Sequence, residues 1–568
     1  MQKVCWRFKN SSVEPDKINE VAKKYSISSI MATVLLNRGL EEEKEIVEYI
    51  KKSLSSVHNP DLLPDMQLAA DRIVRAIDNG EKITVYGDYD ADGVTSTAVL
   101  YGFLCENGAN ADYYIPDRIT EGYGLNIKAI NRLSKLGTKL IITVDCGIAS
   151  VGEVELAKAQ KMEVIITDHH TCHEKIPNAY AVVNPKRQDS EYPFKELAGV
   201  GVAFKLILAI TKCMEKSTKE CFDKYVELAA IGTVADVVSL HGENRVITHY
   251  GVSRLPQTEN FGIKALMKVG GIWDKAVTST DIAFTLSPRI NAAGRMSDAK
   301  LAVGLLLSKS DDEAEQLARQ LNDLNIERQK TEHEIFNEAL EMIDDNIKNK
   351  RIIVLAKEGW HHGVIGIVAA RICEMYYKPC ILISADNGKG KGSGRSVEGI
   401  NLFEALSASD EYLTQFGGHS LAAGLSLDMK DFDLFYKSID KYISGNVKAE
   451  PVKMLDVDCS VPSAFISVNS AKQLKWLEPY GMENEKPVFA MSGVEVISAN
   501  TMGADNRHLK LFVRAGEKEI EAVGFSMGDY AKYLPPARRI DIAFNLEINN
   551  FRDTERVQLI LKDIKSSK

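Results

Sequence analysis

The sequence predicts an α/β protein: a doubly wound, mainly parallel sheet, a long connecting helix, a smaller α/β domain and a C-terminal β-barrel. Short apolar runs alternate with amphipathic stretches of helical length from residue 83 onward, the pattern of a parallel sheet wound by helices. Residues 310–347 contain no glycine or proline, so they predict one continuous helix. Five strand-like runs with turn residues between them fill the last stretch of about 110 residues, as in a small closed barrel.

The first 60 residues are helical in pattern and end at Asn59-Pro60. The 568-residue chain carries 70 basic and 79 acidic side chains, and this net charge of −9 disfavours a broad polyanion-binding surface. No apolar run approaches the roughly 20 residues that span a bilayer, and the N-terminus has no secretory signal. Nine scattered cysteines without a CxxC pair are typical of reduced thiols. We therefore expect a cytoplasmic protein without membrane association.

Residues that can bind metals or catalyse reactions follow three strands predicted in the first α/β domain. The strings ITVYGDYD, KLIITVDCG and EVIITDHH are apolar runs that each end in acids, glycine or histidine. The carboxyl ends of parallel strands meet at one edge of the sheet, where such folds bind their ligands. The three groups are therefore expected to converge.

Three carboxylates alternate in the first of these strings, at Asp88, Asp90 and Asp92. Residues two apart at a strand end point to the same side, and three carboxylates together repel one another unless a cation lies between them. An EF-hand loop is one alternative, but its twelfth position would be Leu100 instead of a glutamate. A solvated acidic turn is the other alternative.

The next two strings end at Asp145 and at Asp168-His169-His170, and Asp236 follows a long apolar helix. Hard carboxylate oxygens with an imidazole suit Mn²⁺ or Mg²⁺ better than metals that prefer sulfur. These carboxylates are too many for one ion. They suit a pair of ions about 3.5–4 Å apart that shares a bridging aspartate, and such pairs catalyse displacement at phosphorus.

The strings GDYDADG, VDCG, DHH and GTVAD, in this order, resemble the four motifs of the DHH phosphoesterase superfamily. The later strings PRINAAGR, GSGRS and FGGHSLAAG resemble the RecJ branch of that superfamily, with its DHHA1 domain. The resemblance covers nearly the whole chain. It implies five regions: an N-terminal helical lead-in (1–60), a DHH catalytic domain (61–305), a long connecting helix (306–348), a DHHA1 domain (349–447) and an OB-fold-like nucleic-acid-binding domain (452–568).

The resemblance also implies an activity. Members of this branch are metal-dependent 5′→3′ exonucleases that hydrolyse single-stranded DNA to 5′-mononucleotides with two divalent ions, Mn²⁺ or Mg²⁺, in recombination and repair. It implies single-stranded DNA as the main partner, single-strand-binding protein and a helicase as further partners, and a monomeric chain. One alternative is a phosphoesterase for short oligoribonucleotides or cyclic dinucleotides, although such relatives typically lack the long helix and the barrel. Another is a catalytically silent DNA-binding scaffold, although every expected ligand is present.

Site residues follow from the resemblance position by position. The implied metal ligands are Asp88, Asp90, Asp92, Asp145, His169 and Asp236. Asp145 would bridge the two ions, and His170 would face the scissile phosphate. Relatives that cut small substrates carry a histidine where this chain has Tyr86.

The second α/β domain is expected to hold the DNA end. The string GKGKGSGRS alternates glycines with Lys389, Lys391 and Arg395, which predicts a nest of backbone N–H groups for an anion; a flexible, lysine-rich surface loop is the alternative. The run after His419 is expected to begin a helix whose N-terminus attracts anions. By resemblance, the residues that bind the DNA and its 5′-phosphate are Arg289, Arg295, Ser393, Gly394, Arg395, Ser396, Gly417, Gly418 and His419.

Three features admit a structural explanation. The adjacent histidines of Trp360-His361-His362 would point to opposite faces of a strand, so we expect them to be structural or to line the substrate site. The polar 310–347 helix is expected to be an exposed strut, with a dimeric coiled coil as the alternative. Aromatic residues of the barrel are expected mostly in its core, with some stacking on bases. They are Trp476, Tyr480, Phe489, Phe512, Phe525 and Phe544.

Overall fold

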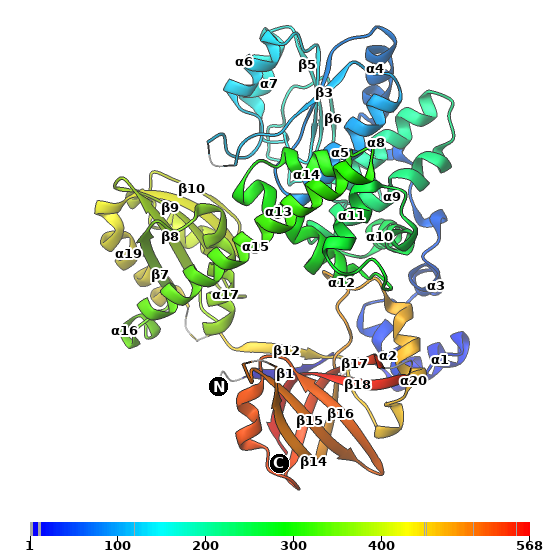
Figure 1. Ribbon diagram of the computed structural model, residues 1–568, viewed down its shortest axis with the longest axis vertical. Helices are drawn as coiled ribbons and strands as arrows, with labels where there is room; N and C mark the ends of the chain where they lie inside the picture. Colours follow the sequence, from blue (N-terminus) through cyan, green and yellow to red (C-terminus); the bar gives the residue numbers. More distant parts are fainter. Residues whose placement is uncertain are drawn as a thin grey trace. The chain divides into compact units, whose positions relative to one another are not determined.

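The computed structural model describes residues 4–9, 13–118, 120–447, 449, 451–503, 505–551 and 554–567 (Figure 1). Among them, no helix is both long and apolar enough to cross a membrane. The chain forms two compact units. Residues 54–451 make up one unit, and residues 1–53 together with 452–568 make up the other.

The first lobe of the 54–451 unit contains a five-stranded parallel sheet in the order β3-β2-β4-β5-β6. Its strands are β2 (Ile83–Tyr86), β3 (Ala111–Tyr114), β4 (Leu140–Val144), β5 (Glu163–Thr167) and β6 (Ala181–Val183). β2 and β4 are buried along their whole length, because alternate residues face two different cores. This arrangement confirms the predicted doubly wound sheet.

Helices cover both faces of this sheet (Figure 1). One face packs against α4 (Met66–Asp78), α5 (Ala91–Glu106) and α8 (Gly199–Cys213), and the other packs against α6 (Ile127–Lys135) and α7 (Val151–Ala159). Short helical turns precede α4 at η2 (Leu54–Ser56) and η3 (Pro60–Leu62). Further helices complete the lobe: α9 (Thr218–Ala235), α10 (Gly242–Arg254), η4 (Leu255–Gln257), α11 (Phe261–Val269), α12 (Ser279–Asp281), the π-helical turn η5 (Ile282–Leu286), α13 (Ser287–Met296) and α14 (Lys300–Leu306).

The long helix expected after residue 306 is α15 (Asp311–Met342), which contains 32 residues. The side chain of Ser310 caps its N-terminus by accepting a hydrogen bond from Glu313 N at 3.3 Å. Its first half packs into the core of the first lobe, and its second half packs into the core of the second. The apolar stripe of α15 is therefore buried within the chain, as expected of a connecting strut and not of a dimeric coiled coil. A short helix, α16 (Asp345–Lys348), follows.

The second lobe is built on a mixed sheet in the order β10-β11-β9-β8-β7. Its strands are β7 (Ile353–Glu358), β8 (Cys380–Asp386), β9 (Lys389–Arg395), β10 (Gln415–Gly418) and β11 (Ala422–Asp428). Only β7 and β8 are parallel neighbours. The helices of this lobe are α17 (His362–Tyr376), α18 (Leu402–Ser407), η6 (Asp410–Tyr412), η7 (Met429–Asp431) and α19 (Phe432–Asn446).

Two local expectations for this lobe are wrong. The glycine-rich string forms the strand β9, hydrogen-bonded to β8 and β11, so its backbone N–H groups belong to the sheet and do not form an anion nest. A Cβ atom at Gly390, Gly392 or Gly394 would lie 2.7–2.9 Å from a neighbouring apolar side chain, so close packing explains these glycines. No helix begins after His419, because β10 and β11 form a tight antiparallel hairpin there.

The other unit contains the predicted barrel, in the order β13-β14-β15-β16-β18-β17, and pairing of β14 with β17 closes it. Its elements are β12 (Lys453–Val457), β13 (Cys459–Ser460), η8 (Ser463–Phe465), α20 (Val468–Leu474), η9 (Lys475–Leu477), β14 (Phe489–Met502), β15 (His508–Ala515), β16 (Lys518–Gly524), η10 (Gly528–Tyr533), β17 (Arg539–Phe551) and β18 (Thr554–Ser566). All five strand-like runs of the sequence are strands of this barrel.

The N-terminal segment belongs to the barrel unit. It forms β1 (Val4–Phe8), α1 (Pro15–Tyr25), α2 (Ser29–Asn37) and α3 (Glu43–Lys51). β1 pairs in parallel with β12, and residues of α2 share a hydrophobic core with the barrel. The sequence predicted the helices but neither the strand β1 nor the association with residues far along the chain.

Candidate active site

The first acidic string folds as the start of α5. Asp90 is the N-cap of this helix, and its Oδ1 accepts hydrogen bonds from the backbone N–H groups of Asp92 and Gly93, both at 3.0 Å. Asp92, in the first turn, accepts the N–H groups of Gly199 at 2.7 Å and Val200 at 2.8 Å with its two oxygens. Asp92 thereby ties the N-terminus of α8 to that of α5.

Asp145 lies directly after β4 in the left-handed region, with a φ of 60°. This conformation is unusual for a residue other than glycine, and such strain is concentrated at functional sites. The Asp145 carboxylate packs against the first residue of α8, because a Cβ at Gly199 would lie 2.5 Å from Asp145 Oδ1. Only glycine at position 199 leaves room for this carboxylate.

The DHH string follows β5. Asp168 Oδ1 accepts the backbone N–H groups of His169 and His170 and lies 2.7 Å from His170 Nδ1, while its Oδ2 accepts Ile148 N. Burial alone would raise the pKa of Asp168, but these hydrogen bonds and the charge of His170 hold it below the usual value. Asp168 therefore positions the two histidines and is not available as a metal ligand.

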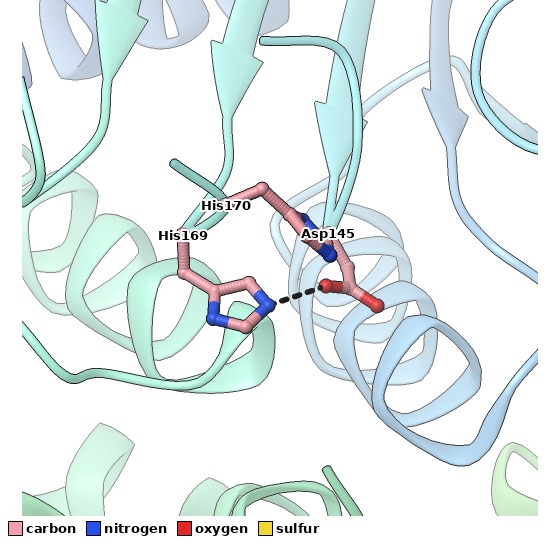
Figure 2. A group of neighbouring side chains, drawn as sticks. All are labelled: Asp145, His169 and His170. Atoms are coloured by element: carbon pink, nitrogen blue, oxygen red, sulfur yellow. Dashed lines mark ion pairs between the residues drawn. The ribbon is translucent and has the colours of Figure 1, made fainter. Parts of the chain in front are cut away.

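The expected ligands converge at the carboxyl edge of the sheet. Within each of three groups, ligand-type atoms lie within 4.8 Å of one another. The groups are Asp88 with Asp90 and Asp145, Asp92 with His169 and Asp236, and Asp145 with His169 and His170. His169 Nε2 lies 3.2 Å from Asp145 Oδ1 and 3.6 Å from Asp236 Oδ2, and Figure 2 shows the first of these contacts. Asp236 comes from the C-cap of α9, as the sequence predicted.

The charges of this acidic cluster are only partly compensated by the chain: Arg118 and Lys186 act on Asp88 and Asp236 from a distance, without a direct ion pair among the described residues. Burial and mutual repulsion raise the pKa of Asp92 to about 7 and raise the pKa values of Asp88, Asp145 and Asp236 well above the usual range. Burial and the neighbouring His170 lower the pKa of His169 to about 3, so its imidazole is neutral. One oxygen each of Asp88, Asp145 and Asp236, and both ring nitrogens of His169, lack a hydrogen bond of normal geometry. Buried oxygens and a neutral imidazole in this arrangement fit divalent cations.

Tyr86 is not part of this cluster. It is fully buried, and its hydroxyl donates to Gly124 O at 3.0 Å and accepts from Asn126 Nδ2 at 3.2 Å. Its ring stacks on Tyr114. The position that carries a histidine in relatives with small substrates thus has a structural role in this chain.

Four arginines next to the acidic cluster form what is here called the cationic group: Arg118, Arg295, Arg328 and Arg395. Burial, together with the charges of Arg118, Arg328 and Arg395, lowers the pKa of Arg295 to about 10. Arg295 Nη1 donates to Gly363 O at 3.0 Å, so it joins α13 of the first lobe to α17 of the second. A cavity of about 440 Å³ lies beside Arg118 and Arg295 and is also lined by Tyr89.

Sequence reasoning missed Arg118, whose guanidinium lies 4.7 Å from the centre of the Tyr89 ring. Its position in the sequence could have indicated it, because Arg118 follows the end of β3 by four residues and so lies at the same edge of the sheet as the acidic residues. Sequence reasoning did identify Ser393 and Arg395, which lie on the face of β9 opposite the packed glycines. Arg395 Nη1 donates to Ser393 Oγ at 3.1 Å and to Gly394 O at 2.8 Å.

The comparisons with known proteins agree with this geometry. Residues 82–233 match the DHH family, N-terminal domain, residues 349–445 match the DHHA1 domain, and residues 457–563 match the RecJ OB domain. The single-stranded-DNA-specific exonuclease RecJ of Bacillus subtilis is 39% identical over 99% of this chain and 71% of its own length. That of Escherichia coli is 33% identical over 94% of this chain and 95% of its own length.

This chain belongs to the RecJ family. The crystal structure of RecJ in complex with Mn²⁺ from Thermus thermophilus matches with a TM-score of 0.85 and 30% identity, over 100% of this chain and 80% of that one. A crystal structure of exonuclease RecJ bound to manganese matches 68% of this chain and 96% of that one, with a TM-score of 0.61 and 35% identity. The family resemblance predicted from the motifs is therefore confirmed.

Several expected DNA-binding residues of this RecJ-family chain make hydrogen bonds within the fold. Arg289 donates to Thr285 O at 2.7 Å and to Asn322 Oδ1 at 3.1 Å, so it braces the π-helical turn against α15. Ser396 Oγ donates to Ile400 O. Gly417, Gly418 and His419 lie in the β10–β11 hairpin, one strand beyond β9. His419 N donates to Ala422 O, and Ala422 is the β11 neighbour of Arg395.

The remaining predictions concern histidines and aromatic residues. His361 is the N-cap of α17, where its Nδ1 accepts from Gly363 N at 3.1 Å, and neither it nor His362 joins a metal-type group among the described residues. In the OB domain, Phe489 and Phe544 are fully buried in the core, whereas Phe525 is 59% exposed and Trp476 is 43% exposed. Tyr480 and Phe512 are half-buried. Phe525 and Trp476 are thus the most accessible of the six for stacking on bases.

Proposed function

We propose that this RecJ-family chain hydrolyses single-stranded DNA from its 5′ end to 5′-mononucleotides, with two divalent cations, Mn²⁺ or Mg²⁺, at the acidic cluster. The observation that carries the proposal is the convergence of buried, only partly compensated carboxylates on a neutral imidazole at one sheet edge. One cation would be held by Asp88, Asp90 and Asp145, and the other by Asp92, His169 and Asp236, with Asp145 between the two groups. Such a pair supplies a water of lowered pKa and neutralises charge on the phosphate.

The chain's own residues orient the reaction. Asp168 holds Nδ1 of His170, which leaves Nε2 to face the scissile phosphate or the leaving oxygen. The charge of Asp168 supports a protonated His170: burial would lower the pKa of this histidine, but Asp168, Asp92 and Asp90 raise it above the usual value. A cationic imidazole next to the scissile bond would stabilise the negative charge that develops there.

We assign the 5′-phosphate to the cationic group next to the metals. Arg295 and Arg395 supply guanidinium groups suited to bidentate phosphate contacts, and Ser393 adds a hydroxyl on the same face of β9. Gly394 and Ser396 belong to the same segment as Arg395. Arg289 lies in α13, the helix that carries Arg295, and its hydrogen bonds to Thr285 and Asn322 brace that helix. Gly417, Gly418 and His419 would contact DNA farther from the terminal phosphate. Anchoring the terminal phosphate next to the cations sets the 5′→3′ polarity.

The proposal includes a cellular role. All nine cysteines are free thiols, which fits the expected cytoplasmic location. The OB domain supports binding of single-stranded DNA along the strand beyond the active site. By family resemblance, the chain would act as a monomer in recombination and repair, with single-strand-binding protein and a helicase that supplies DNA ends.

Hydrolysis of a 5′-labelled oligonucleotide in the presence of Mn²⁺ tests the proposal. We expect the label to appear as a mononucleotide from single-stranded substrate and much more slowly from duplex. Release of unlabelled nucleotides first, from the 3′ end, would contradict the polarity. Equal turnover of a dinucleotide and a long strand would favour the small-substrate phosphoesterase.

A further inference from the structure

The segment Glu121-Gly122-Tyr123-Gly124 lies between β3 and α6 and brings one side chain to the acidic cluster. The Tyr123 hydroxyl donates to the backbone oxygen of Asp145 at 3.0 Å and lies 3.1 Å from His170 Nδ1. The Tyr123 ring meets the His170 ring edge-on, with 5.6 Å between centroids. Tyr123 therefore contacts both the expected bridging aspartate and the expected phosphate-facing histidine, although no motif marks it.

The contact with His170 sets which ring nitrogen faces the substrate. The hydrogen of the Tyr123 hydroxyl is directed at the Asp145 carbonyl, so its oxygen presents lone pairs to His170 Nδ1. Asp168 Oδ1 lies on the same nitrogen at 2.7 Å. A nitrogen that faces two acceptors must carry its hydrogen, and Nε2 is then the nitrogen that faces the substrate. Tyr123 and Asp168 together fix the rotation of the ring.

The contact with Asp145 acts on a strained backbone. The carbonyl that accepts the Tyr123 hydroxyl belongs to the residue with a φ of 60°, and the Asp145 N–H donates to Thr167 O at 3.1 Å. The two hydrogen bonds hold the peptide on both sides of Asp145 and so fix the direction of its carboxylate. Without the hydroxyl, this peptide would lose one of the two bonds that oppose its relaxation.

The loop itself is anchored at both ends. Glu121 Oε1 accepts the Tyr114 hydroxyl at 2.6 Å, and Gly124 O accepts the Tyr86 hydroxyl at 3.0 Å. Gly122 and Gly124 adopt φ values of 80° and 82°, which favour glycine and turn the chain so that Tyr123 lies between them. Tyr123 remains 50% exposed, although it is held in this position.

We propose that Tyr123 is a positioning residue for phosphodiester hydrolysis, fixing Nε2 of His170 toward the substrate and the carboxylate of Asp145 toward the cations. The inference rests on the proposed function, because it assigns Tyr123 a role at the same site. Its effect is on the chemical step and not on the binding of DNA, since the interactions of Tyr123 among the described residues are with His170 and Asp145 and not with Arg295 or Arg395.

The test is Tyr123→Phe in the full chain, which removes the hydroxyl and keeps the ring. We expect kcat on single-stranded DNA to fall about tenfold, with KM changed less than about twofold. Tyr180→Phe is the matched control, because it removes a tyrosine hydroxyl of the same lobe that accepts a hydrogen bond from Arg75 and contacts neither the loop nor His170. Its kcat should stay within about twofold of the unsubstituted chain.

A double-mutant cycle separates positioning from a general structural role. In a His170→Ala background, Tyr123→Phe should reduce kcat much less than tenfold, since part of its target is absent. An equal effect in both backgrounds, an effect on KM alone, or unchanged kcat in Tyr123→Phe would overturn the inference. These outcomes differ from failure of the proposed function, in which the unsubstituted chain itself would not release the 5′ label.

Discussion

The first lobe buries two clusters of charged residues that differ in how their charges are compensated. In the acidic cluster, the carboxylates of Asp88, Asp145 and Asp236 lie together, and no ion pair with a lysine or arginine is found for them among the described residues. The other cluster, here called the lysine cluster, consists of Lys205, Glu243, Tyr192 and His58. Both contain charged side chains that are almost fully buried, such as Asp88 and Asp145 in one and Lys205 and Glu243 in the other, so burial alone does not distinguish a functional site.

The lysine cluster is complete within the chain. Lys205 and Glu243 are fully buried, with 2.5 Å between Nζ and Oε1. Lys205 Nζ also donates to His58 O at 2.6 Å, and Glu243 accepts the Tyr192 hydroxyl and the backbone N–H of His58. A buried charge that is paired inside the chain is part of the fold, whereas one left unpaired indicates a ligand supplied from outside.

The largest expected effect is on catalysis. Asp145→Ala should reduce cleavage of single-stranded DNA by more than about a thousandfold, because both groups of expected metal ligands use or adjoin this carboxylate. The metal-free variant should be no less stable to heat than the unsubstituted chain, since one repelling charge is removed. Cleavage assays and thermal unfolding check this pair of results. Intact cleavage would contradict the assignment of Asp145.

Breaking the lysine cluster should lower stability and leave catalysis unchanged, the opposite of what we expect for Asp145→Ala. Lys205→Met leaves Glu243 buried without its partner and should lower the free energy of unfolding by about 3–5 kcal/mol, as measured by urea unfolding. The kcat of the folded fraction should not change. Lys205→Met combined with Glu243→Leu is the control, and it should recover most of the lost stability because no unpaired charge remains. A loss of kcat with normal stability would mean that the cluster is not purely structural.

Metal ions should stabilise the first lobe. At Mn²⁺ a hundredfold above its dissociation constant, we expect the free energy of unfolding to rise by about 2.7 kcal/mol, and chelation should reverse this. The same titration on Asp145→Ala should give a much smaller rise. Equal stabilisation of both proteins would show that Mn²⁺ binds elsewhere.

Two arginines of the 54–451 unit also differ in whether their charge is paired inside the chain, and for them we expect the smallest effect on function. Arg395 donates to neutral oxygens, whereas Arg187 is paired with Asp65 and Asp189. Arg395→Gln should weaken DNA binding about tenfold and reduce the slope of log affinity against log salt by about 0.7, the value for one phosphate contact on a single strand. Arg187→Gln should leave both unchanged in binding titrations over a range of salt concentrations. Similar slopes for both variants would remove Arg395 from the phosphate site.

The acidic cluster was predictable from sequence because its residues follow directly from strand ends, and parallel strands place those ends together. The order of the apolar runs was enough to locate Asp88, Asp145 and His169. Asp236 needed a helix end as well, and the apolar helix before it was recognisable. The doubly wound sheet and the closed barrel followed from the same local patterns.

The rest depended on packing between elements distant in sequence. Glycines at alternate positions suit a loop as well as a strand, and the close neighbours that require Gly392 and Gly394 in β9 come from β8, β11 and α18. Tyr123 shows no pattern, because its contacts are with residues 22 and 47 positions away. The pairing of β1 with β12 leaves no mark in either segment alone.

That pairing has a consequence for how the molecule is made. Val4 lies beside Lys453, so the first unit to be synthesised is the last that can be completed. At about 5–20 residues per second, the ribosome needs roughly 20–80 s to deliver the partner strands after α3 has emerged. Through that interval the apolar side chains of Met31, Val34 and Leu35 have no barrel to cover them, while residues 54–451 can already fold. The core shared by α2 and the barrel is therefore among the last parts of the molecule that can form during synthesis.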